Sequence, residues 1–185
     1  MANTIVPVKL RPHLIPFFYK EFNADSDAHY LNTRVKASKI LINSSIGKLI
    51  RIALEKSDYP VKPQKFYIYF YFPEKIASKA TAELYQTVNG TNCFLQVPDK
   101  LAQDINDIFE DLFRIQFINT IKIAKKYNPD IKIKNVIIDF IKEYSLDEFN
   151  FREKSLRRLY NNNVNKPLLH RMQTTASNRV LNYKQ

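Results

Sequence analysis

Residues 98–129 have the sequence PDKLAQDINDIFEDLFRIQFINTIKIAKKYNP, the longest helical pattern in the chain. Pro98 cannot continue a preceding strand, and the Asp99 side chain can cap the first free N–H groups of a helix. Apolar side chains then recur at helical spacing in two neighbouring stripes, Leu101, Ile105, Ile108, Leu112 and Ile115 in the first and Phe109, Phe113, Phe117 and Ile121 in the second. Pro129 ends the pattern. We therefore predict one long helix over residues 99–128, with an apolar face wide enough to contact two layers.

The charged residues of this helix are placed so that they interact favourably with its dipole. Its first half holds four acidic residues, Asp104, Asp107, Glu110 and Asp111, and its last turns hold three lysines, Lys122, Lys125 and Lys126. The acidic residues are spaced three and four apart, so they lie side by side and could bind a metal or a second subunit. Because no histidine or second acidic element is near them in the sequence, we expect a solvated acidic face.

The strand patterns predict a small antiparallel or mixed sheet packed on the long helix, and hence an α+β body over residues 1–128. Residues 65–72 (KFYIYFYF) alternate with period 2 between an all-apolar side and a tyrosine side. Residues 82–88 and 91–97 flank Asn89-Gly90, a strong hairpin signal because both turn residues favour positive φ. The remaining predictions are strands over residues 5–10 and 35–42, helices over residues 11–22 (interrupted at Pro16) and 43–56, and a polar loop over residues 23–33.

Two short amphipathic helices are expected past Pro129, over residues 134–145 and 151–161, with a polar break between them at residues 146–150. Residues 129–161 thus have the outline of a helix-turn-helix, although no turn glycine is present. The last residues of the chain have little apolar material. We therefore expect residues 162–185 to form an extended basic arm that becomes ordered on a partner.

Positive charge gathers at this end of the chain. The formal net charge is +11, and residues 151–185 hold eight basic residues and one acidic residue. A cationic end on a near-neutral body is typical of polyanion binding, with nucleic acid as the first candidate partner and an anionic protein surface as the second; an ordinary basic tail is the plain alternative. The candidate phosphate contacts are Arg152, Lys154, Arg157, Arg158, Lys166, Arg171, Arg179 and Lys184. Candidates for additional hydrogen bonds to the backbone or base edges are Ser155, Asn161, Asn162 and Asn163.

The sequence has no catalytic signature, and we expect no enzyme, no metal site and no cofactor. Two glycines cannot build a Gly-rich phosphate loop, and the single cysteine, Cys93, cannot form an intramolecular disulfide or a cysteine-based zinc site. His13, His29 and His170 stand apart from any recognisable triad or ligand pair. No apolar run approaches a membrane span and the start lacks a signal peptide, so we expect a soluble cytoplasmic protein.

The tyrosine side of residues 65–72 admits two interpretations. Tyr67, Tyr69 and Tyr71 could stack unpaired bases, as aromatic residues on exposed sheets do. The glycine and basic residues of the RNA-recognition pattern are missing. We therefore favour a half-buried face that a helix or another subunit covers.

Residues 6–14 (VPVKLRPHL) and 139–160 (DFIKEYSLDEFNFREKSLRRLY) resemble small basic proteins of bacteriophages and mobile elements of Bacteroidota. The second segment is similar to a helix–break–helix that recurs in those proteins. The resemblance implies a phage or mobile-element origin and either DNA binding or a place in the virion. It assigns no site residue.

Two functions remain open from the sequence. The first is a non-enzymatic, homo-oligomeric DNA-binding accessory or regulatory protein, whose basic helix and arm contact the phosphate backbone in the host cytoplasm. The second is a structural protein of a phage virion, in a capsid, portal ring or tail, whose arm binds neighbouring subunits or other phage structural proteins. Neither function involves a membrane.

Overall fold

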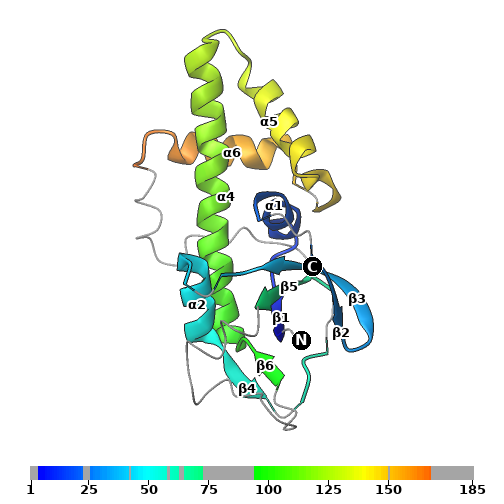
Figure 1. Cartoon of the computed structure of the whole chain (residues 1–185). Coiled ribbons are helices and arrows are strands. Elements are labelled where there is room, and N and C mark those ends of the chain that lie inside the picture. Colours follow the sequence, from blue (N-terminus) through cyan, green and yellow to red (C-terminus); the bar gives the residue numbers. More distant parts are fainter. Residues whose placement is uncertain are drawn as a thin grey trace. The chain divides into compact units, whose positions relative to one another are not determined.

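The computed structural model describes residues 4–22, 26–41, 43–57, 59–62, 65–72, 94–149 and 151–167. The chain has an α+β fold, whose elements are labelled in Figure 1. Its internal contacts divide it into two compact units, the first made of Met1–Arg11 with Phe18–Ile105 and the second of Pro12–Phe17 with Asn106–Gln185. This boundary falls inside the long helix. The sequence-based division at residues 128 and 161 is a different partition and remains a prediction.

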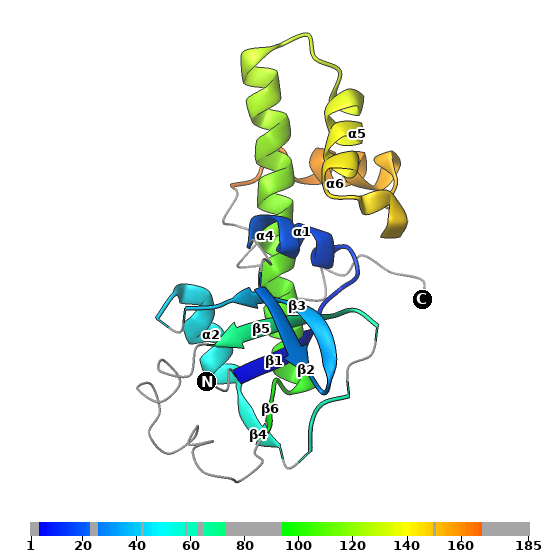
Figure 2. The ribbon, with the colours of Figure 1, turned by 45° about the vertical axis from the view of Figure 1, so that its right-hand side comes forward.

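A four-stranded sheet lies at the centre of the first unit. Its strand order is β1 (Thr4–Lys9), β5 (Tyr67–Phe72), β3 (Thr33–Lys39) and β2 (Ser26–Tyr30). β1 and β5 are antiparallel, β5 and β3 are parallel, and β3 and β2 are antiparallel (Figure 2). The sheet is therefore mixed, one of the two forms that the sequence predicts.

β5 is the most apolar strand of this unit and supplies much of its core. Ile68, Phe70 and Phe72 are at most 2% exposed, and the ring centroid of Phe18 lies 5.5 Å from that of Phe70. The predicted period-2 alternation is confirmed within the strand. Phe66, expected on the same apolar side, is instead 41% exposed, because its φ of 71° belongs to a turn.

A β-hairpin replaces most of the polar loop that was expected over residues 23–33. β2 and β3 pair from Ser26↔Ala37 to Tyr30↔Thr33, and Leu31 and Asn32 join them. The two turn residues have φ of 47° and 65°, the left-handed values that a two-residue hairpin turn requires. Sequence reasoning misses this hairpin because the turn has no glycine and the strand SDAHY shows no apolar alternation.

The first helix, α1 (Leu14–Glu21), is shorter than the predicted helix over residues 11–22, and Pro16 does not interrupt it. Pro16 is the third residue of α1. At that position a backbone N–H has no acceptor within the helix, so a proline removes no hydrogen bond.

The second helix, α2 (Ser45–Ala53), begins where the sequence predicts. Gly47 N donates a hydrogen bond to Ser44 Oγ at 3.0 Å, which is the geometry of an N-cap. The helix ends earlier than predicted, because β4 (Glu55–Ser57) follows and pairs antiparallel with β6 (Phe94–Gln96) in a separate two-stranded sheet. The predicted strand over residues 82–88 and the Asn89-Gly90 turn lie outside the described residues.

The long helix is confirmed as α4 (Asp99–Tyr127). The Pro98 carbonyl accepts a hydrogen bond from Ala102 N at 2.8 Å, so Asp99 is the first helical residue and not the cap. Its carboxylate still lies in the first turn, where it interacts favourably with the helix dipole.

Only one of the two predicted apolar stripes of α4 is buried throughout. The buried stripe, at most 2% exposed, is Phe109, Phe113, Phe117 and Ile121. In the other stripe Ile105 is 1% exposed, but Ile108 and Ile115 are half-buried and Leu112 is 36% exposed. The apolar face of α4 is therefore only partly buried along this stripe.

In the second unit, α5 (Ile133–Glu143) runs back along α4, and η1 (Leu146–Phe149) leads into α6 (Glu153–Asn163) (Figures 1 and 2). The ring centroid of Phe140 lies 5.7 Å from that of Phe113 and 5.1 Å from that of Phe117, so α5 packs on the buried side of α4. Both predicted helices are confirmed with small shifts at their ends. The break between them is not wholly polar, because Leu146 is 0% exposed and anchors it in the core.

Candidate nucleic-acid interface

Helix α6 separates its apolar and basic side chains onto opposite sides. The inward residues, at most 9% exposed, are Leu156, Leu159 and Tyr160. The outward residues, spaced i, i+3, i+4 and i+7, are Lys154, Arg157, Arg158 and Asn161. Residues with this spacing share one side of a helix. The structure therefore brings three of the predicted phosphate contacts together, and we call these four outward residues the α6 basic face.

Two more predicted contacts flank this helix. Arg152 directly precedes α6 and is exposed, and Lys166 follows its last turn and is also exposed. Arg171, Arg179 and Lys184 lie outside the described residues. The structure therefore describes five of the eight predicted cations, all with exposed side chains.

One acidic residue, Glu153, lies within α6 and pairs with a member of the basic face. Arg157 Nε lies 2.7 Å from Glu153 Oε1, in an i,i+4 arrangement, with side-chain exposures of 47% and 30%. An ion pair this exposed contributes only about 0.3–0.5 kcal/mol to stability. Because the interaction is weak, Arg157 can exchange it for a phosphate at little cost.

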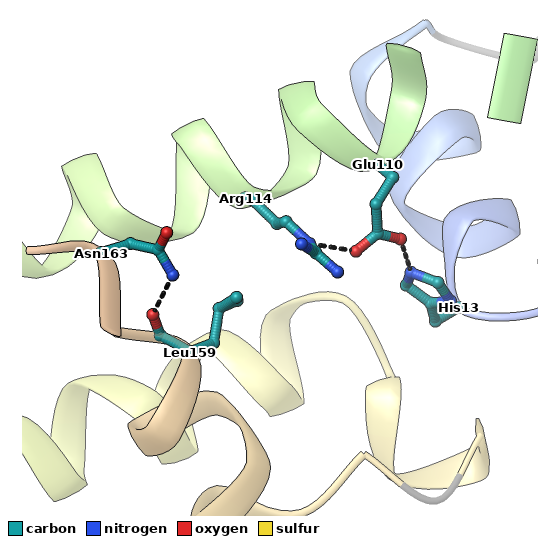
Figure 3. Close-up of polar contacts among 5 residues, drawn as sticks. All are labelled: His13, Glu110, Arg114, Leu159 and Asn163. Atoms are coloured by element: carbon teal, nitrogen blue, oxygen red, sulfur yellow. Dashed lines mark hydrogen bonds and ion pairs between the residues drawn. The ribbon is translucent and has the colours of Figure 1, made fainter. Parts of the chain in front are cut away.

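The three asparagines at the end of α6 differ in their surroundings. Asn161 and Asn162 are exposed. Asn163 donates a hydrogen bond from Nδ2 to the Leu159 carbonyl oxygen at 2.7 Å, as Figure 3 shows. Its side chain therefore satisfies a carbonyl in the last turn of the helix, and we no longer count Asn163 among the groups that could contact a base.

A buried polar cluster lies beside the aromatic core of the second unit. His13 Nε2 donates to Glu110 Oε2 at 2.7 Å, and Arg114 Nε donates to Glu110 Oε1 (Figure 3). His13, Glu110 and Arg114 are 0%, 1% and 3% exposed. The cluster joins residues 12–17 to α4 through hydrogen bonds that water does not reach.

Two sequence-based expectations are wrong here. His13 does not stand apart, and the acidic residues of α4 are not a solvated face throughout, since Glu110 and Asp111 are each 1% exposed. The physical reason is helical position, because Glu110 lies on the same side of α4 as Phe113 and Phe117. A sequence signal was available: an arginine four residues after an acid, both within a buried apolar stripe, suggests a buried ion pair.

Phe151 connects the cluster to the basic helix. The His13 ring stacks on the Phe151 ring with a centroid distance of 4.6 Å and an interplanar angle of 27°, and it meets the Phe113 ring edge-on at 5.3 Å. Phe151 is 7% exposed and directly precedes Arg152 and the start of α6. The cluster therefore holds the chain in place at the point where the α6 basic face begins.

The turn between α4 and α5 adds cations that the sequence-based list leaves out. They are all exposed: Lys122, Lys125, Lys126, Lys132 and Lys134. The first three lie at the C-terminal end of α4, where the helix dipole favours them. Lys132 and Lys134 lie at the start of α5, which has no acidic residue in its first turn and no side-chain cap, so the dipole does not explain them. Because Glu110 and Asp111 are buried, the exposed side chains of this unit carry a larger excess of positive charge than its amino-acid composition suggests.

The tyrosine side of β5 is half-buried, as the favoured interpretation expects. Tyr67, Tyr69 and Tyr71 each have intermediate exposure. The ring centroid of Tyr30 lies 5.6 Å from that of Tyr69, and Tyr30 Oη donates to the Val61 carbonyl at 2.8 Å. Burial, together with the nearby Tyr67, raises the pKa of Tyr69 above its usual value of 10.0. This side of the sheet is therefore partly covered within the unit itself, and we do not assign it to base stacking.

The described residues include neither a candidate metal site nor a candidate membrane-spanning helix. No group of three or more His, Cys, Asp or Glu side chains is placed to hold a metal ion. No helix in that part of the chain has the length and apolar character needed to cross a bilayer. In comparisons with protein-family models, curated proteins and solved structures, none matches this chain.

Proposed function

We propose that this protein is a non-enzymatic DNA-binding protein that contacts the phosphate backbone with the α6 basic face and with the basic residues that follow it. The observation behind the proposal is the two-sided character of α6. Its apolar side is fixed in the core, so Lys154, Arg157 and Arg158 project together into solvent.

The dimensions of α6 suit a nucleic-acid duplex. The helix has 11 residues, and at a rise of about 1.5 Å per residue it is roughly 16 Å long. The major groove of B-DNA is about 12 Å wide and admits a helix. Arg157 and Arg158 each present a planar fork of donors that matches a phosphate or the edge of a guanine. Exposed Asn161 adds a donor and an acceptor beside them.

The biological setting of the proposal comes from sequence resemblance. Residues 139–160, which include the last five residues of α5, all of η1 and most of α6, are the segment similar to bacteriophage and mobile-element proteins. We therefore propose an accessory or regulatory role for such an element in the host cytoplasm.

The test compares three matched variants of the full chain, each of which removes three positive charges. The first is Lys154→Gln, Arg157→Gln and Arg158→Gln on α6. The second is Arg171→Gln, Arg179→Gln and Lys184→Gln in the arm. The control is Lys48→Gln, Lys62→Gln and Lys65→Gln in the first unit, where all three lysines are exposed.

We expect the α6 variant to bind a fluorescein-labelled duplex more weakly by on the order of 10- to 100-fold in an anisotropy titration at low salt. The arm variant is expected to lose affinity as well, and the control is expected to stay near the wild type. Equal losses in all three variants would show that only net charge matters and would contradict a defined site. A wild-type chain that binds no duplex but forms a large, regular assembly would contradict the proposal and favour the structural role in a virion.

A further inference from the structure

One side of α4 stays open to solvent although it is largely apolar. Leu112, Ile123 and Tyr127 are 36%, 55% and 83% exposed. Ile108 lies in line with them and is half-buried. All of these residues belong to the second unit. The neighbouring phenylalanine stripe of α4 is buried, whereas this stripe has no covering element among the described residues.

The intervals between the residues of this stripe are the same whether they are counted from its N-terminal or its C-terminal end. Its positions are 108, 112, 116, 119, 123 and 127, which fall within an arc of about 100° on an α-helix of 3.6 residues per turn. A two-fold axis between residues 117 and 118 exchanges Leu112 with Ile123, Gln116 with Asn119, and Ile108 with Tyr127. A surface that is complementary to itself in this way is what a closed two-fold dimer requires.

Polar residues at the centre of the stripe add to this complementarity. Gln116 is exposed and Asn119 is half-buried. Each amide has donors and an acceptor, so Gln116 of one copy can pair with Asn119 of the other. Polar pairs at the centre of a helix–helix seam favour one register over others.

The charges of α4 favour the antiparallel direction. The exposed charges of its first half are net acidic, with Asp99 and Asp104 against Lys100, and those of its last turns are all basic, at Lys122, Lys125 and Lys126. Antiparallel pairing brings the acidic half of one helix beside the basic half of the other, whereas parallel pairing would bring like charges together.

From this symmetry and charge pattern we propose that two copies of the chain associate through an antiparallel pairing of their α4 helices. The contact consists of Ile108, Leu112, Gln116, Asn119, Ile123 and Tyr127 from each copy. The dimer forms without nucleic acid, so the inference does not depend on the proposed DNA binding.

The test is sedimentation velocity on the full chain without nucleic acid, over a range of micromolar concentrations. We expect a dimer for the wild type and monomers for Leu112→Lys and for Ile123→Glu measured separately. The two variants mixed together are expected to form a heterodimer, since the introduced lysine meets the introduced glutamate and the second contact keeps its native Leu112–Ile123 pair. Ile52→Glu on α2 is the matched control, because Ile52 is 76% exposed outside the stripe and its substitution should leave the dimer intact.

Three results would overturn the inference: a monomeric wild type at every concentration, single variants that remain dimeric, or a mixture that stays monomeric. The last result would specifically exclude the antiparallel register, because parallel pairing does not place residue 112 opposite residue 123. The far-UV circular dichroism of each variant checks that it is folded. Since the substituted side chains are exposed, we expect spectra equal to that of the wild type.

Discussion

Glu110 is a carboxylate inside an aromatic core, and its surroundings explain how it is accommodated. A buried, unpaired charge costs several kcal/mol, and this cost is offset only when the charge is paired and hydrogen-bonded. Glu110 receives one hydrogen bond from His13 and one from Arg114, and all three side chains are at most 3% exposed. Glu110 is the member that links the other two, so its loss would remove a buried hydrogen-bond partner from both His13 and Arg114.

We expect Glu110→Ala to lower the free energy of unfolding by about 3–5 kcal/mol, because the buried Arg114 and His13 side chains would each lose the interaction with the Glu110 carboxylate. Urea denaturation followed by circular dichroism measures this, and suits a chain without tryptophan. Asp139→Ala is the control, since Asp139 is exposed on α5 and should change stability by less than about 0.5 kcal/mol. Equal effects of the two substitutions would mean that the buried cluster contributes nothing to stability.

Among the helices and strands, the connection between α5 and α6 shows how a tight turn forms without glycine. Tyr144 caps α5, and Ser145 follows with a φ of 48°, so the chain turns in the left-handed region. A non-glycine residue there costs roughly 1–2 kcal/mol. The burial of Tyr144 and Leu146 on either side holds Ser145 in this conformation. The chain thus turns sharply after α5 without a glycine and reaches α6 through η1, and the helix-turn-helix outline stays a prediction.

Ser145→Gly is expected to raise the free energy of unfolding by about 0.5–1 kcal/mol, because glycine adopts positive φ without steric strain. A Ser→Gly substitution within a helix should instead lower the free energy of unfolding. Ser155→Gly, at an exposed position of α6, is expected to destabilise by about 0.5 kcal/mol. Thermal or urea unfolding of both variants gives the comparison, and a destabilised Ser145→Gly would contradict the strained turn.

For the whole molecule, the net charge of +11 bears on function through the positions that the charged side chains take in the fold. In the described part of the second unit, eleven of the twelve basic side chains are exposed, whereas two of the nine acidic side chains are fully buried. Folding therefore concentrates positive potential on this surface. Such a surface attracts polyanions through the release of their counterions, and that release makes binding depend steeply on salt.

If all eight predicted cations contact phosphates, the logarithm of the duplex affinity should fall with the logarithm of salt concentration with a slope near about −7. The Lys154→Gln, Arg157→Gln and Arg158→Gln variant should make this slope less negative by roughly 2–3, because each lost phosphate contact removes about 0.9. Anisotropy titrations at several salt concentrations measure both slopes. A wild-type slope shallower than about −2 would argue against phosphate contacts as the source of affinity.

The local sequence pattern by itself determined those helices and strands that have one regularly repeating buried side. The helical spacing of apolar residues was enough to predict α4, α5 and α6, and the same spacing predicted that Lys154, Arg157 and Arg158 project outward. The period-2 alternation likewise predicted β5. These predictions succeed because a helix or strand with one buried side repeats that side at a fixed interval, so the pattern is visible in any short window.

Tertiary structure alone decided the features that join distant segments. His13 and Glu110 are 97 residues apart, and nothing in either local sequence reveals their hydrogen bond. The polar strand β2 forms because it can pair with β3. The stripe of Leu112 and Ile123 is open because α5 packs on the neighbouring phenylalanine stripe of α4. In each case burial depends on what the rest of the chain places opposite a residue, and local periodicity does not contain that information.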